Sequence, residues 1–492
     1  MSQQRPAGGA RMRVAVIGAG FSGLAAAVEL GRRGITDYVV FDEAEGVGGT
    51  WWKNRYPGAE VDLESHIYSF SFARHDWKRT HALWFELQEY LDQVADAHGV
   101  TPRLRLGERV RTATWDATEN VWRLTTSTGA NHGTFDAVIS GVGFLNVPVM
   151  PSLAEDAADF PGTVCHTSSW PEGLSMRDRR VAVVGTGSSA VQVVSEAVRE
   201  ASQVTVFQSE PNWLLPKGSR EFTPTERRWN RWAPVYRWRR WRLYVDYDRR
   251  QADAQHARTD GAANRDRRSA SLDFLRRSMS DRPDLLAVLT PTFPFEARRT
   301  VISDTYYRDL KSPKVTLVPH RAARLTASGL QDATGATHDA DIVVLATGFD
   351  GANYLSTLEV IGRDGVELHN VWKGEPAALY GLMVPGFPNF FMLYGPNTNA
   401  VPLPAFYEAQ ARFVGTVLTR LRRAGARTAE VKPAPYERFN RALQAQLART
   451  VWPTTRSYFT ATTGKVVSQW PYSATRYVVG TWLAARRDVE LR

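Results

Sequence analysis

The feature that most constrains this chain is a glycine-rich turn that occurs twice, each time between a predicted buried strand and a predicted helix. The first copy has a strand at 13–17, the turn Gly18-Ala19-Gly20-Phe21-Ser22-Gly23 and a helical stretch at 24–31. The second has a strand at 180–184, the turn Gly185-Thr186-Gly187-Ser188-Ser189-Ala190 and a helical stretch at 191–198. Such glycines allow a tight bend, the approach of a pyrophosphate to the backbone and close packing of helix on strand, while the helix N-terminus attracts the phosphate charge. The sequence therefore predicts an α/β protein with two Rossmann-like dinucleotide-binding domains.

The residues after the next strand indicate which nucleotide each turn binds. In the first copy, the strand at 38–41 ends at Asp42 and Glu43, about 20 residues beyond the glycines, where a carboxylate binds ribose hydroxyls. This end suits an unphosphorylated ribose such as that of FAD. In the second copy, the strand at 203–207 runs into Gln208-Ser209-Glu210, which indicates less clearly which cofactor binds there. Two nucleotide sites in one chain suggest electron transfer between a nicotinamide and a flavin; a glycine turn without a ligand is the less favoured alternative.

Two similar strand ends suggest that one domain is inserted in the other. The strand at 340–345 runs into Ala346-Thr347-Gly348-Phe349-Asp350, and an earlier counterpart lies at 137–143. Both are interpreted as crossings between an FAD domain and an inserted NADPH domain. The predicted parts are 1–147 (FAD), 148–222 (NADPH), 223–290 (helical insertion), 291–345 (NADPH) and 346–492 (FAD).

Composition excludes several classes of protein. The 492 residues include 61 Lys+Arg and 51 Asp+Glu, a net charge of +10, which attracts anions but does not by itself imply binding to nucleic acid. The single cysteine, Cys165, excludes an internal disulfide framework, a cysteine-rich metal site and a two-cysteine redox centre. No run reaches the ~18 apolar residues of a membrane span, and residues 1–13 lack the apolar core of a signal peptide. We expect a cytoplasmic protein without an integral membrane segment. No metal site is expected either, because the sequence contains no residue spacing typical of metal ligands.

Two further motifs resemble those of a known family. The first is Phe160, Gly162, His166, Trp170 and Pro171, which matches the pattern FxGxxxHxxxW followed by Pro or Asp. The second is Gly48-Gly49-Thr50-Trp51, Tyr56-Pro57-Gly58 and Asp62. With the two glycine turns, they resemble the type I Baeyer-Villiger monooxygenases of the flavin-containing monooxygenase superfamily. The resemblance implies that FAD, NADPH and O₂ are used to insert one oxygen atom next to the carbonyl of a lipophilic or cyclic ketone through a C4a-peroxyflavin, giving an ester or lactone.

The resemblance also implies the catalytic residues. The stretch 294–299 is similar to the family's active-site segment, which makes Arg299 the catalytic arginine and Arg298 a contact of the coenzyme phosphate. A guanidinium stays cationic and donates several hydrogen bonds, so it suits the negative charge that develops on oxygen in this reaction. Asp62 is predicted to orient Arg299. His166 is predicted to couple domain movement to cofactor handling rather than to act as a base.

The cofactor-binding residues follow from the turns, the motifs and the resemblance near the C-terminus. They are Gly18, Gly20, Phe21, Ser22, Gly23, Asp42, Glu43, Gly49, Thr50, Trp51, Tyr56, Asp62, Tyr68, Gly185, Thr186, Gly187, Ser188, Ser189, Gln192, Ser209, Arg298, Arg299, Thr347, Gly348, Asn397 and Trp470. Ser209 departs from the family, which places there an arginine that pairs with the 2′-phosphate of NADPH. Because Arg298 remains, NADPH is expected, and NADH stays possible.

Two alternative functions remain open from the sequence. One is a flavin monooxygenase that oxidises nitrogen or sulfur. The other is a peripheral membrane or nucleic-acid binding protein that retains a flavin fold, suggested by the arginines and aromatic residues between 227 and 250. We expect instead that these aromatic residues pack on the nicotinamide domain, with a break near Pro234 and the arginines in water. A polar loop at 261–268 and a helix at 272–289, interrupted near Pro283, are predicted to follow.

Overall fold

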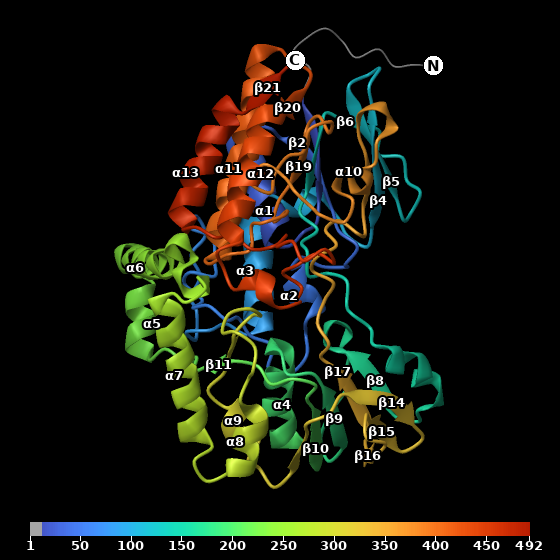
Figure 1. Ribbon diagram of the computed structural model, residues 1–492. Coiled ribbons are helices and arrows are strands. Elements are labelled where there is room, and N and C mark those ends of the chain that lie inside the picture. Colours follow the sequence, from blue (N-terminus) through green and yellow to red (C-terminus); the bar gives the residue numbers. More distant parts are fainter. Residues whose placement is uncertain (1–11) are drawn as a thin grey trace.

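The computed structural model describes residues 12–492, with the backbone alone at 156, 159 and 253. The predictions for residues 1–11, which begin the first FAD part and precede the first strand, lie outside the described residues. Figure 1 shows two α/β bodies, one above the other in this view, with a group of helices at the lower left.

The first glycine turn belongs to a five-stranded parallel sheet of order β19-β7-β1-β2-β3. Its strands are β1 (Arg13–Ile17), β2 (Asp37–Phe41), β3 (Leu104–Arg105), β7 (Ala137–Ser140) and β19 (Phe390–Met392). Helix α1 (Phe21–Arg32) connects β1 to β2 and packs against the long C-terminal helix α11 (Leu403–Ala424). Helices on the sheet explain why its strands are continuous apolar runs.

The second glycine turn belongs to another five-stranded parallel sheet, of order β13-β10-β9-β17-β8. Its strands are β8 (Thr163–His166), β9 (Arg180–Val184), β10 (Gln203–Phe207), β13 (Val315–Val318) and β17 (Ile342–Leu345), and α4 (Ser188–Glu200) connects β9 to β10. An antiparallel sheet of β14 (Ala322–Thr326), β15 (Gly329–Asp332) and β16 (Thr337–Asp339) follows β13 in the chain.

The order of the strands confirms that the second fold is inserted in the first. The chain leaves the first sheet after β7, forms the whole second sheet, and returns after β17. A four-stranded sheet of order β18-β4-β5-β6 also contains strands from both sides of the inserted fold. It contains β4 (Val110–Asp116), β5 (Val121–Thr126), β6 (Thr134–Phe135) and β18 (Glu359–Ile361).

The helical insertion contains α5 (Pro224–Asn230), α6 (Ala233–Gln251), α7 (Ala262–Ser278) and α8 (Pro283–Leu289). The breaks predicted near Pro234 and Pro283 are present, because each proline lies in the first turn of a helix. The predicted loop at 261–268 is wrong, since these residues begin α7. Only Asn264, Ser271 and Leu275 of α7 are buried, so the helix has almost no apolar stripe from which it could be predicted.

The predicted packing of α6 is also wrong. Its tyrosines face the flavin half of the molecule, where Tyr236 is buried beside His66 and Trp77, and its tryptophans are exposed. The helix carries two aromatic stripes, and periodicity alone does not tell which of them faces inward. Tyrosine is the better inner residue here because its hydroxyl finds hydrogen-bond partners at this boundary.

The remaining elements complete the two bodies. The helices are α2 (Thr50–Lys53), α3 (Trp84–Ala97), α9 (Tyr306–Asp309), α10 (Leu368–Trp372), α12 (Pro433–Leu447) and α13 (Ala474–Arg487). The short strands are β11 (Leu214–Leu215), β12 (Val301–Ile302), β20 (Ala429–Val431) and β21 (Val489–Leu491). Within residues 12–492, none of the helices combines the length and the apolar character needed to cross a bilayer.

Candidate active site

Both glycine turns open into the same cavity of about 1000 Å³. The cavity is lined by residues of the first and second sheets, by the segment between α2 and α3, and by the residues before β12. A cavity of this size between two dinucleotide folds has room for large ligands.

The first turn requires its glycines for steric reasons. Gly18 has a φ of +104°, and a Cβ on Gly23 would lie 1.7 Å from the carbonyl oxygen of Gly18. Asp42 supports the turn, because its carboxylate accepts hydrogen bonds from the backbone N–H groups of Ala19 (2.6 Å) and Ala44 (2.8 Å). No side chain caps the N-terminus of α1, so its backbone N–H groups are available to a phosphate.

The second turn is built in the same way and contacts the flavin half of the chain. Gly185 has a φ of +125°, and a Cβ there would lie 2.5 Å from the carbonyl oxygen of Ala346. At the start of α4, the side chains of Ser189 and Gln192 form hydrogen bonds with the hydroxyl of Tyr56, at 3.1 and 2.7 Å. Tyr56 therefore links the two dinucleotide folds at the cavity wall.

Arg299 and Asp62 form an ion pair at the centre of the cavity wall. Both Nε and Nη2 of Arg299 donate hydrogen bonds to Oδ2 of Asp62, the former at 3.2 Å. Burial alone would raise the pKa of Asp62, but the attraction of Arg299 and Lys217 is stronger and lowers it below its ordinary value. The charge of Asp62 in turn raises the pKa of Arg299 above its ordinary value. The guanidinium is thus held as a cation, with its remaining donors beside the cavity.

Arg298, the predicted phosphate contact, is not a free cation. Its Nη1 pairs with the carboxylate of Glu210, and its guanidinium lies 4.8 Å from the ring centroid of Phe293. Ser209 lines the cavity beside this pair. Near the end of β10, the cavity is therefore lined by the guanidinium of Arg298, which is already paired, and by the hydroxyl of Ser209.

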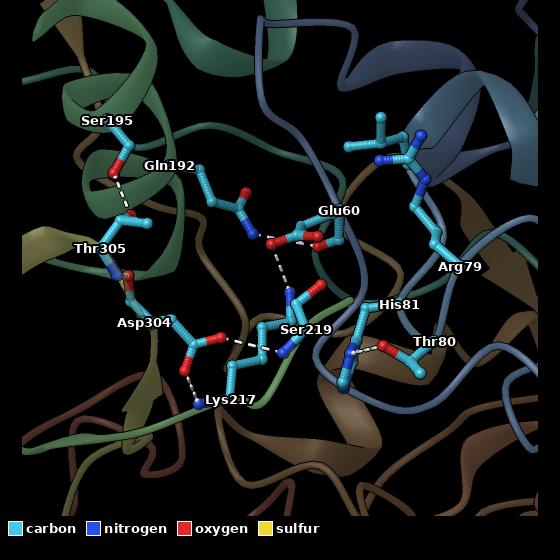
Figure 2. A network of polar contacts seen from close by, with 12 residues as sticks. Glu60, Arg79, Thr80, His81, Gln192, Ser195, Lys217, Ser219, Asp304 and Thr305 are labelled. Carbon is cyan, nitrogen blue, oxygen red and sulfur yellow. Dashed lines mark hydrogen bonds and ion pairs between the residues drawn. The ribbon is translucent and has the colours of Figure 1, made fainter. Parts of the chain in front are cut away.

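A polar network adjoins Asp62 and joins the two halves of the chain (Figure 2). Nζ of Lys217 lies 2.6 Å from Oε1 of Glu60, and the Lys217 side chain is only 2% exposed. The paired strands β11 and β12 bring Lys217 and Asp304 together, and the Asp304 carboxylate accepts hydrogen bonds from the backbone N–H groups of 217, 218 and 219. Gln192 donates to the backbone oxygen of Glu60 at 3.0 Å. Burial raises the pKa of Glu60, although Lys217 opposes this effect.

Most of the predicted site residues line the cavity. They are Gly18, Gly20, Phe21, Ser22, Asp42, Glu43, Gly49, Thr50, Trp51, Tyr56, Asp62, Tyr68, Gly185, Thr186, Gly187, Ser188, Ser189, Gln192, Ser209, Arg298, Arg299, Thr347 and Gly348. This placement is what a binding role requires, and the roles themselves stay predictions.

Four predicted residues lie outside the cavity lining. Gly23 lies under the first turn, and His166 is buried at the end of β8, where its ring contacts Phe349 edge-on and its Nδ1 bonds Ser168. The side-chain amide of Asn397 donates hydrogen bonds to the backbone oxygens of Val466 and Gln469. The indole N–H of Trp470 donates to the backbone oxygen of Ser473. These last two side chains are bonded to the backbone within the C-terminal part of the chain.

Several lining residues were not predicted. Lys53, Arg109, Asn146, Arg321, Tyr394, Asn399, Tyr407, Arg456 and Tyr458 belong to this group. Burial raises the pKa of the Tyr458 hydroxyl and the nearby charge of Arg299 opposes this effect, so Tyr458 belongs to the centre of the site. Tyr394 and Asn399 lie within three residues of the predicted Asn397, and Lys53 lies inside the second motif, whereas the others carry no local motif.

Known proteins resemble this chain over most of its length. Residues 15–224 match the family described as pyridine nucleotide-disulphide oxidoreductase. A Baeyer-Villiger monooxygenase of Streptomyces coelicolor is 36% identical, over 94% of this chain and 89% of its own length. An FAD-binding monooxygenase of Aspergillus niger is 32% identical over 95% of this chain and 79% of its own, and a phenazine N-monooxygenase of Lysobacter antibioticus is 32% identical over 82% and 81%.

Solved structures agree over the whole chain. A closed crystal structure of cyclohexanone monooxygenase superposes with a TM-score of 0.86 at 28% identity, covering 98% of this chain and 99% of the other. Cyclohexanone monooxygenase from Rhodococcus bound to NADP⁺ gives a TM-score of 0.85 with the same identity and coverage.

Proposed function

Because this chain belongs to the flavin-dependent Baeyer-Villiger monooxygenases, we propose that it uses FAD and NADPH to insert one oxygen atom of O₂ next to the carbonyl of a lipophilic ketone. The observation that carries the proposal is the Arg299–Asp62 pair, which lies in the cavity that both dinucleotide turns share. The product is an ester, or a lactone when the ketone is cyclic.

The residues present fit both cofactors. The first turn would hold FAD, because no side chain caps the N-terminus of α1 and the Asp42 carboxylate lies beside the turn at the cavity wall. The second turn, Ser188, Gln192 and Arg298 would hold NADPH. When bound, NADPH supplies the hydride that reduces the flavin, and the reduced flavin supplies activated oxygen. The relatives include an FAD-binding monooxygenase and a structure with NADP⁺.

The role of Arg299 follows from charge. Attack of an oxygen nucleophile on a ketone places negative charge first on the nucleophile and then on the carbonyl oxygen. A cation whose donors face the cavity stabilises both charges, and Asp62 holds it in place so that no reorganisation is needed. Tyr394, Tyr407, Tyr458 and Phe144 supply an aromatic wall, which supports a lipophilic substrate.

The domain boundaries and the location of the protein belong to the same proposal. The boundary at 147 lies between β7 and β8, and that at 345 coincides with the end of β17. The boundaries at 222 and 290 enclose α5 to α8. A cytoplasmic location is supported by the single, buried Cys165.

Product analysis tests this function. The FAD-loaded protein, NADPH and ¹⁸O₂ are incubated with a panel of cyclic and linear ketones, and esters or lactones carrying one ¹⁸O atom are expected by mass spectrometry. Consumption of NADPH that yields only hydrogen peroxide with every ketone would contradict the proposal.

Oxygenation at nitrogen or sulfur is the second candidate. It is favoured by the similarity to the phenazine N-monooxygenase. Heteroaromatic amines and sulfides therefore belong in the same panel, and conversion of these alone would establish this candidate instead.

The pairing of Glu210 with Arg298 predicts a weak preference between the coenzymes. An acidic residue after the second strand of a Rossmann fold favours a free ribose hydroxyl, whereas a cation favours the 2′-phosphate. Replacing Glu210 by Gln releases Arg298 and removes a charge that repels the phosphate. We expect the ratio of kcat/KM for NADPH to that for NADH to rise about tenfold, which corresponds to about 1.4 kcal/mol.

Steady-state kinetics with both coenzymes measures this ratio. Glu200→Gln, an exposed carboxylate at the far end of α4, is the matched control and should leave the ratio unchanged. An unchanged ratio in the Glu210 variant would show that this carboxylate does not face the coenzyme.

A further inference from the structure

Helices α5 and α6 lie at the left edge of the molecule in Figure 1, and four tryptophans in and between them are exposed. Trp229, Trp232, Trp238 and Trp241 are 57%, 58%, 55% and 61% exposed. Large apolar side chains that are exposed singly are common, but these indoles form two exposed pairs on consecutive helices. The ring centroids of Trp229 and Trp232 are 6.3 Å apart, and Trp238 and Trp241 are three residues apart on α6. Such groups of exposed apolar side chains mark interaction sites.

The inner side of α6 holds this face outward. Tyr236 is buried, and its hydroxyl accepts a hydrogen bond from the indole of Trp77 at 3.4 Å. Arg240 donates to the backbone oxygen of His66 at 2.8 Å. At the far end of the helix, the hydroxyls of Tyr244 and Tyr247 bond to Thr475 and Glu64. Rotating the helix to cover the indoles would break all of these contacts.

The exposed face of α6 is cationic as well as aromatic. Arg237 and Arg242 lie at helical spacing beside Trp238 and Trp241, and the guanidinium of Arg242 lies 5.3 Å from the Trp238 ring. Among the residues that the structure describes, neither arginine has an ion-pair partner. Asp248, an acidic residue of the same helix, is turned toward α13 and accepts hydrogen bonds from Thr475.

We propose that this Trp/Arg face, formed by Trp229, Trp232, Arg237, Trp238, Trp241 and Arg242, docks the enzyme on an anionic lipid surface. Indoles partition into the interfacial layer of a bilayer, and guanidinium groups pair there with lipid phosphates while their alkyl chains remain among apolar groups. A second copy of the chain fits less well, because two such faces would bring unpaired arginines together. Docking would place the enzyme where lipophilic ketones accumulate, but the surface does not depend on that substrate class.

Vesicle co-sedimentation of the FAD-loaded protein tests the proposal. Vesicles of phosphatidylcholine alone are compared with vesicles that also contain phosphatidylglycerol, at low and high salt. We expect binding to the anionic vesicles that weakens with salt. Trp238→Ala/Trp241→Ala and Arg237→Gln/Arg242→Gln should each weaken it at least tenfold, and neither should change turnover of a water-soluble ketone.

Matched controls lie at another exposed part of the fold. The apolar control is Val366→Ser/Val371→Ser, next to and within α10, and the cationic control is Arg111→Gln/Arg123→Gln, on β4 and β5. Each control removes as many exposed apolar or cationic groups as the corresponding α6 variant and should leave binding intact. Equal binding to both kinds of vesicle, or binding that the α6 variants do not change, would overturn the proposal. Two further results would overturn it. One is that the protein does not bind vesicles but forms a dimer, which Trp238→Ala/Trp241→Ala dissociates. The other is salt-sensitive binding to single-stranded RNA without binding to vesicles.

Discussion

Replacement of Arg299 by alanine is expected to lower kcat for ketone oxygenation by about 100- to 1000-fold, the effect of removing a donor that stabilises a developing oxyanion. Oxidation of a sulfide by the same preparation should fall much less, because no carbonyl oxygen gains negative charge in that reaction. The measurement is the rate of ester formation and of sulfoxide formation, each at saturating NADPH. The ratio of the two rates distinguishes a catalytic role from general damage to the site.

Two further variants keep this prediction testable if the alanine variant folds poorly. Arg299→Ala leaves the Asp62 carboxylate without its main cation, whereas Arg299→Ala/Asp62→Asn removes both charges and should show the same loss of ketone activity. Arg299→Lys keeps the charge but not the forked donors, so an intermediate rate is expected. Equal losses for ketone and sulfide in all three variants would mean that Arg299 acts on the cofactors and not on the carbonyl.

Replacement of Lys217 by methionine is expected to destabilise the protein by about 3 kcal/mol, because the carboxylate of Glu60, whose side chain is only 23% exposed, is left without its cation. For domains of this size, such a loss lowers the midpoint of thermal unfolding by about 6 °C or more. Burial already raises the pKa of Glu60, and loss of Lys217 raises it further. The destabilisation should therefore shrink as the pH is lowered toward the range in which Glu60 takes up a proton.

Unfolding of the holoenzyme, followed by release of flavin fluorescence at several pH values, measures this effect. Lys217→Met/Glu60→Gln should recover most of the lost stability, since neither charge then remains. Lys311 pairs with Asp281 at 2.9 Å, but the two side chains are 30% and 64% exposed, so Lys311→Met should change stability by at most about 1 kcal/mol. Equal effects of the two lysine variants would show that the Lys217–Glu60 pair is not a special link between the halves.

The parts of the fold that were predicted from sequence are those encoded by local chemistry. A turn in which Gly18 or Gly185 has a positive φ, followed by a helix and preceded by an apolar strand, can be recognised in a short stretch of chain. Asp62 and Arg299 were predicted as partners from two short motifs far apart in the chain, and the structure brings them into contact.

The predictions that failed concern the surroundings of a residue. The loop predicted at 261–268 is a helix because the side chains of Asn264 and Ser271 donate hydrogen bonds to the backbone of neighbouring segments and Leu275 is buried. The roles predicted for Asn397 and Trp470 stay predictions, but their side chains bond to backbone groups and lie outside the cavity lining. A motif gives the type of residue, but not the direction in which its side chain points.

The sequence by itself determined the two nucleotide folds and the insertion of one in the other, because glycine turns act through their immediate neighbours. The type of chemistry was implied by the resemblance of two short motifs to a known family. Only the tertiary structure decided which charges meet and which aromatic face of α6 is left in water. The Lys217–Glu60 pair depends on the pairing of β11 with β12, and the exposure of the tryptophans depends on hydrogen bonds between α6 and segments up to 231 residues away. Such contacts are long-range in the chain, and no local pattern encodes them.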